Sequence, residues 1–209
     1  MEDEQDSLKE LNQRFFLLMN DALSIVKAAR DSDDDVAKRS FVRAVFAFIE
    51  GVTHGLKMVA LDSHIRKEDT FSRAEESLLL EEAYELNEKG QPIVKPKYLT
   101  LPRNIKFAFE QQARVTFSSF KLDLDGEGWS SLMSSVSVRN RLTHPKSLIE
   151  LHVSDQEVEG AEKALHWFAI SYVSALADSY RALNRKLEEA QEILSKTETA
   201  LDKGLKKSV

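Results

Sequence analysis

The longest regular pattern in the sequence lies in its C-terminal part. The capping box Ser154-Asp155-Gln156-Glu157 precedes apolar residues that recur at spacings of three, four or seven. These residues are Leu165, Phe168, Tyr172, Leu176, Leu183, Leu187, Leu194 and Leu201. The pattern predicts one helix of more than roughly 40 residues. Its last part, residues 187–209, is rich in Glu and Lys, and we expect it to project as a coiled-coil arm or to fray.

Helical spacing also runs through most of the remaining chain. The sequence has only seven glycines and four prolines, which favours long helices with few joints over a turn-rich β fold. The second predicted helix is apolar on much of its circumference, as is typical of a central bundle helix, and Ser32 is its expected N-cap. The predicted helices before the C-terminal one cover residues 6–30, 33–62, 71–89, 105–120 and 129–144.

These elements predict an all-α, up-and-down helical bundle formed by a single domain, residues 1–209. A helix-plus-loop insertion is expected over residues 63–103. Three of the four prolines fall within residues 90–104, so this part of the insertion is expected to be an extended loop with room for a short strand pair.

Composition excludes several kinds of site. The chain has no cysteine, so disulfides and thiolate metal sites are excluded. The net charge of −6 means that any RNA site must be a local basic patch. The chain has no glycine-rich phosphate loop, nucleophile elbow or dinucleotide fingerprint, so no cofactor is expected. The acidic N-terminus, and the lack of an apolar run near about 18 residues, predict a cytoplasmic protein that does not contact a membrane.

Two patterns with some likeness to metal sites are interpreted as structural. The segment "DLDGEG" resembles a calcium loop, but aligning Gly126 as the loop glycine places Lys121 and Leu132 at ligand positions. It is therefore expected to be a solvated turn. Glu50 and His54 stand one helical turn apart, which places them on one face, but no second copy of the pair exists. We interpret them as a polar pair at the edge of the core, and no metal is predicted.

The segment "VRNRLTHPK" concentrates polar and basic residues at the end of an apolar helix that Pro145 closes. At about 100° per residue, Asn140 and His144 lie on one helical face, while Arg139 stands about 140° away from His144. A histidine at a helix C-terminus feels the negative end of the dipole, which favours the imidazolium. A titratable histidine, a fixed cation and an amide suit attack of an RNA 2′-hydroxyl on its phosphate without a metal. Arg141 and Lys146 are expected to hold neighbouring phosphates.

The residues Arg139-Asn140-Arg141-Leu142-Thr143-His144 resemble the ribonuclease motif of the HEPN superfamily, which is an arginine, a polar residue, three more residues and a histidine. The segment "SFVRAVFAFIEGVTHGLK" is similar to an early helix of that family, in which an acidic residue can face the active site; Glu50 is the matching candidate. The likeness is specific over the six-residue motif only, and residues 63–103 and the C-terminal extension fall outside it.

The resemblance implies a helical bundle that dimerises, so that two motifs form one composite cleft. It implies a metal-independent endoribonuclease in a toxin or anti-phage setting, which leaves a 2′,3′-cyclic phosphate. His144 would be the general acid or base, Arg139 would stabilise the phosphorane and Asn140 would orient the phosphate or the histidine. An antitoxin-paired branch carries a modifiable tyrosine two residues after the histidine; that position is Lys146 here, which argues against that route. The alternative is an inactive HEPN-like protein that binds or regulates a partner.

Overall fold

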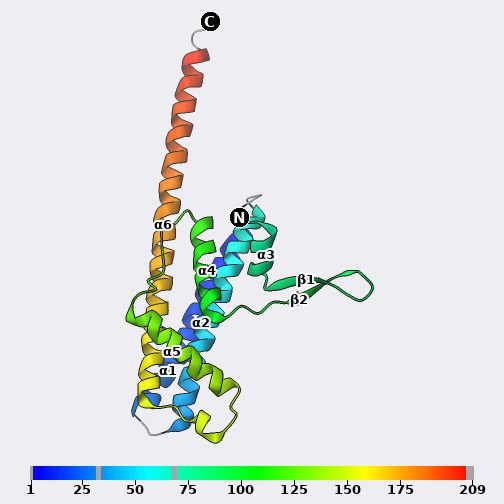
Figure 1. Cartoon of the computed structure of the whole chain (residues 1–209). Helices are drawn as coiled ribbons and strands as arrows, with labels where there is room; N and C mark the ends of the chain where they lie inside the picture. The colour runs from blue at the N-terminus through cyan, green and yellow to red at the C-terminus, as the bar shows by residue number, and fades with distance from the viewer. Residues whose placement is uncertain (1, 32–33, 67–69, 206–209) are drawn as a thin grey trace.

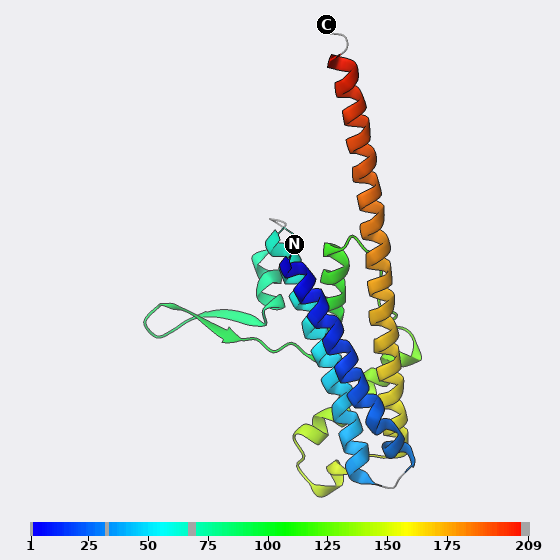
Figure 2. The same cartoon turned by 180° about the vertical axis from the view of Figure 1, so that it is seen from behind.

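Helices α1 (Glu2–Asp31) and α2 (Asp35–Arg66) form a long antiparallel pair along one side of the molecule (Figure 1 and Figure 2). The computed structural model describes the backbone of residues 2–31, 34–66 and 70–205, and the side chains within 7–31, 34–63 and 70–198. Helix α4 (Leu101–Val115) packs on α2, and α5 (Glu127–Thr143) crosses the lower part of the bundle in Figure 1. Helix α6 (Asp155–Leu205) runs along the bundle and continues well beyond it. The predicted all-α bundle is confirmed.

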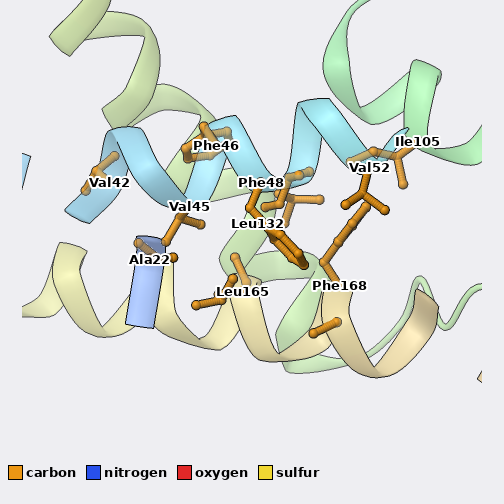
Figure 3. Close-up of a cluster of buried hydrophobic side chains, with 14 of the residues drawn as sticks. Ala22, Val42, Val45, Phe46, Phe48, Val52, Ile105, Leu132, Leu165 and Phe168 are labelled. Carbon is orange, nitrogen blue, oxygen red and sulfur yellow. The ribbon is translucent and has the colours of Figure 1, made fainter. Parts of the chain in front are cut away.

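Helix α2 is the centre of the core. Figure 3 shows its apolar side chains facing residues of α1, α4, α5 and α6, and Phe48 meets the Phe168 ring edge-on, with centroids 5.6 Å apart. Such a surrounding is expected for a helix that is apolar on most sides. Its large apolar residues that are fully or almost fully buried include Phe41, Val42, Val45, Phe46, Phe48, Ile49, Val52 and Leu56.

Helix α2 bears on the expected lack of an apolar stretch of about 18 residues. Within the described residues, its segment Asp35–Ser63 is the one stretch long and apolar enough to cross a membrane, judged by length and composition only. The most apolar window of this segment is 56% buried inside the bundle. The core helix of a soluble protein passes the same test, so this finding says little about membranes.

The insertion differs from its prediction. The expected helix over residues 71–89 is wrong in its second half, because α3 covers only Arg73–Leu79 and is followed by strand β1 (Glu82–Leu86). Strand β1 pairs with β2 (Pro92–Pro96) as an antiparallel hairpin that projects from the bundle in Figure 1. The break falls at Glu81, whose backbone φ of 56° lies in the left-handed region that a continuing helix cannot use. The second strand does lie in the proline-rich segment that was expected to have room for a strand pair.

Helix ends follow local signals. Ser154 accepts from the Glu157 backbone N–H (3.3 Å) and its own N–H donates to the Glu157 carboxylate (2.9 Å), so the predicted capping box of α6 is confirmed. Ser32, the expected cap of α2, lies outside the described residues; the Asp34 carboxylate accepts from the Val36 N–H at 2.8 Å. Helix α4 begins and ends about four residues earlier than predicted, since Pro102 suits its first turn.

The final part of α6 leaves the bundle and exposes apolar side chains. Leu187, Ile193 and Leu194 are 58%, 66% and 59% exposed. A single helix of 51 residues agrees with the predicted length of roughly 40 or more. The predictions of a single domain and of an insertion over residues 63–103 stay predictions.

Candidate functional site

Helix α5 carries the motif residues and is anchored by its apolar side. Val138 and Leu142 are 6% and 3% exposed and pack into the core. Neighbouring positions of the helix therefore face outward, and Asn140 is exposed while Arg139 is half-buried. The helix ends at Thr143, as Pro145 predicts, and the His144 N–H donates to the Asn140 carbonyl at 3.1 Å.

Arg139 and Glu50 meet although 89 residues separate them in the sequence. Nη2 of Arg139 donates to Oε1 of Glu50 at 2.6 Å, and Nη1 donates to Oδ1 of Asn140 at 3.1 Å. Both charged side chains are partly exposed, at 35% and 39%. The structure thus brings together three of the predicted site residues and fixes the guanidinium between an acid and an amide.

His144 stands apart from this cluster within one chain. Its side chain is exposed, and it makes no hydrogen bond or ion pair with any residue that the structure describes. The expected shared face with Asn140 is realised as a backbone hydrogen bond rather than as a side-chain contact. In the single chain the imidazole is therefore free to meet another molecule.

The two predicted phosphate-binding residues have different surroundings. Arg141 donates to the His152 carbonyl and to the Glu157 carboxylate (2.9 Å), which joins α5 to the first turn of α6. Lys146 is exposed beyond the helix end, and its backbone N–H donates to the Glu150 carboxylate at 2.6 Å. Arg141 thus has a structural role where α5 meets α6, and its role toward phosphate stays a prediction.

Arg139 and Glu50 line a pocket of about 330 Å³ between α2, α4, α5 and the segment that follows β2. Two larger hollows, of about 550 and 660 Å³, contain none of the predicted site residues. The residues that line the smaller pocket are Glu50, His54, Glu81, Tyr98, Leu99, Leu101, Asn104 and Arg139. Most of these side chains are polar, so the pocket suits a polar ligand.

A buried ion pair supports one wall of this pocket. Lys57 is fully buried and donates to the Glu81 carboxylate, which also accepts from Nδ2 of Asn104 at 3.2 Å. Partial burial of Glu81 disfavours its charged form, but the hydrogen bond and charge of Lys57 outweigh this and hold its pKa below the usual value. Oδ1 of Asn104 is buried and has no partner among the described residues. The wall therefore presents one unused acceptor.

His54 lines the same pocket as Arg139, although the sequence did not make it a candidate site residue. Burial lowers its pKa, and the positive charges of Lys57 and Arg14 add to this effect, against smaller opposite contributions from Glu81 and Glu10. The i, i+4 spacing correctly placed it beside Glu50, but the spacing did not indicate that Arg139 would line the same pocket as His54. Among the described residues, no group of three or more His, Asp or Glu side chains could hold a metal ion.

No family model, curated protein or solved structure matches the chain. The likeness to the HEPN superfamily accordingly rests on the motif at residues 139–144 and on the segment around Glu50.

Proposed function

We propose that the protein is a cytoplasmic, metal-independent endoribonuclease that acts as a homodimer in a toxin or anti-phage setting. The observation that carries this proposal is the contact between Arg139 and Glu50, next to a histidine left exposed at the end of the same helix. The resemblance predicts that an acidic residue of the early helix faces the motif, and the contact agrees with that expectation. A regulatory protein partner also belongs to such a setting.

The chemistry follows from the residue types. The RNA 2′-oxygen attacks the adjacent phosphorus, the bond from phosphorus to the 5′-oxygen breaks, and a 2′,3′-cyclic phosphate forms. Arg139 stabilises the charge on the phosphorane oxygens, and Asn140 orients the phosphate. His144 transfers a proton as general acid or base. A guanidinium supplies the positive charge that a metal would otherwise provide, and Lys146 attracts a neighbouring phosphate.

Dimerisation addresses the separation of Arg139 from His144. In a symmetric dimer the same surface is used by both chains, so two copies of α5 would face each other at their ends. Each cleft would then combine Arg139 of one protomer with His144 of the other. The exposure of His144 in the single chain is compatible with this arrangement.

The decisive experiment measures RNA cleavage in EDTA with the wild type, His144→Ala and His166→Ala. His166 is an exposed histidine on α6 outside the motif, so its variant is the matched control. We expect the wild type and the control to cut RNA and leave cyclic phosphate ends, and His144→Ala to be at least about 10²-fold slower. Strict dependence on added Mg²⁺, or equal cleavage by all three proteins, contradicts the proposal.

The alternative is an inactive binding or regulatory module. Two observations favour it: Glu50 already neutralises Arg139, and the projecting part of α6 exposes apolar side chains that suit a protein partner. On this alternative, Arg139→Ala and His144→Ala change neither RNA integrity nor growth on overexpression. A toxic wild type with harmless variants excludes it.

A further inference from the structure

His54 shares a pocket with the motif arginine, whereas the motif histidine lies outside it in the single chain. We propose that His54 is a second acid–base residue of the ribonuclease site and removes the proton from the attacking 2′-hydroxyl. This inference rests on the proposed function and adds a residue that the six-residue motif does not contain.

The placement of His54 follows from helix geometry. His54 stands one turn after Glu50 on α2, so both side chains lie on the same face. Glu50 holds the Arg139 guanidinium at 2.6 Å, which orients the cation toward the face that carries His54. The pocket they share, about 330 Å³, is within the usual range for small-ligand sites and can admit a ribose with its phosphate. Tyr98, 86% exposed, stands at its border.

The imidazole of His54 is not occupied by a structural task. It is partly exposed, and it makes no hydrogen bond or ion pair with any residue in the described part of the chain. A histidine retained for packing is normally buried and hydrogen-bonded, as polar groups in protein cores are. The ring nitrogens of His54 are therefore available to a substrate hydroxyl.

The surrounding charges favour the neutral imidazole that a base requires. Partial burial lowers the pKa of His54 most, and the positive charges of Lys57 on α2 and Arg14 on α1 lower it further. Arg139 from α5 lines the same pocket. Glu81 and Glu10 act in the opposite direction, but they are paired with Lys57 and Arg14. Glu50, which also lines the pocket, is paired with Arg139. At neutral pH the lone pair of His54 is free to accept a proton.

The complete step then uses two histidines. His54 accepts the 2′-hydroxyl proton while the 2′-oxygen forms its bond to phosphorus. The 5′-oxygen leaves as the phosphorus bond breaks and takes a proton from the His144 imidazolium. The cycle ends when solvent returns each imidazole to its starting state, so protons and electrons balance without a metal or a redox partner. Opposite protonation states of two groups predict a bell-shaped dependence of kcat/KM on pH.

The kinetic test compares His54→Gln with His166→Gln across pH in EDTA. Glutamine retains polarity but does not titrate, and His54 is exposed, so both variants are expected to fold. We expect His54→Gln to lower kcat/KM about 10²- to 10⁴-fold and to remove the acidic limb of the profile, with the control unchanged. Added imidazole is expected to restore part of the activity of His54→Ala. If the wild type cuts and His54→Gln keeps the same rate and profile, the role of His54 is refuted while the ribonuclease stands.

A binding measurement separates the two proposals further. NMR titration of histidine-labelled protein with a single-stranded DNA oligonucleotide, which lacks the 2′-hydroxyl and is not cut, reports on the imidazoles directly. We expect the His54 signal to shift and its pKa to rise, because a nearby phosphate favours the imidazolium, while His166 stays unchanged. A response of His144 without one of His54 overturns the inference and leaves the ribonuclease. A wild type that cuts no RNA overturns both.

Discussion

His54 and His144 differ in what the single chain supplies to them. The pocket around His54 is assembled from α2, α4, α5 and the insertion, and its charges are cross-linked by Arg139–Glu50 and by Lys57–Glu81. His144 ends a helix, is exposed and contacts no charged group among the described residues. The surroundings of His54 are thus complete within one chain, whereas on the proposed function those of His144 would be completed by a second chain.

On the proposed function, this difference explains how a short motif, Arg139 to His144, can form a site of defined geometry. Arg139 is fixed by tertiary contacts within the chain. On the proposed function, the side of the site that binds phosphate would therefore exist before a partner arrives. Association would add His144, and activity would then depend on protein concentration. Variants in the pocket that contains Arg139 should therefore behave differently from variants at His144.

The largest effect should come from mixing two inactive variants. Arg139→Ala and His144→Ala each remove one half of the site from every chain. If the halves come from different protomers, mixed dimers contain one intact site, and random exchange should restore about a quarter of wild-type activity. The measurement is RNA cleavage after co-expression or after exchange of subunits. Failure to recover any activity, in a mixture shown to form mixed dimers, would place both groups in one chain.

The ion pair beneath the pocket should govern stability rather than association. Glu81→Leu leaves Lys57 charged and fully buried, so we expect unfolding to become easier by about 3 kcal/mol. Lys57→Met removes the buried charge and leaves Glu81, which is 34% exposed, in contact with water; its cost should be about 1 kcal/mol. Urea denaturation measures both. Equal losses would show that the pair does not act as a buried charge with its counter-ion.

The contact between Glu50 and Arg139 should matter more for rate than for stability. Both side chains are more than a third exposed, so Glu50→Gln should change the free energy of unfolding by less than about 1 kcal/mol. Loss of the anchor lets the guanidinium leave its position, and we expect cleavage to slow about tenfold. Glu189→Gln, which breaks an exposed ion pair with Lys186 on the projecting part of α6, is the matched control. A Glu50→Gln protein as fast as this control would show that the guanidinium needs no anchor.

Hydrophobic periodicity predicted the helical bundle because each long helix is specified by the sequence of its own segment. The apolar circumference of α2 predicts its burial, and the capping box of α6 predicts where that helix begins. Both predictions agree with the structure. The second half of the predicted 71–89 helix failed for the opposite reason. Its acidic residues suit a helix, but the hairpin is selected by contacts with distant residues, among them Lys57 with Glu81.

The candidate site was predictable only in part, because contacts between distant segments are not specified by local patterns. Spacing placed Glu50 beside His54, and the motif placed Arg139 near the end of a helix. The meeting of Arg139 with Glu50 depends on how α5 crosses α2, which neither local pattern specifies. The resemblance, not the spacing, made Glu50 a candidate, and no signal in the sequence joined His54 to the motif.

The smallest effect, and the one most specific to the pocket, is the pH dependence of stability. The pKa of His54 in the folded protein lies below 6.5, its ordinary value, so the unfolded chain binds more protons as the pH falls through 6.5. The folded state should therefore lose stability below this pH, and His54→Gln should remove that part of the loss. The difference in unfolding free energy between wild type and variant, measured by urea denaturation from pH 7.5 to about 5.5, isolates the contribution of His54 from the carboxylates, which titrate lower. If the wild type instead gained stability relative to the variant on acidification, His54 would be held as an imidazolium and could not serve as the base, whereas nothing expected of His144 would change.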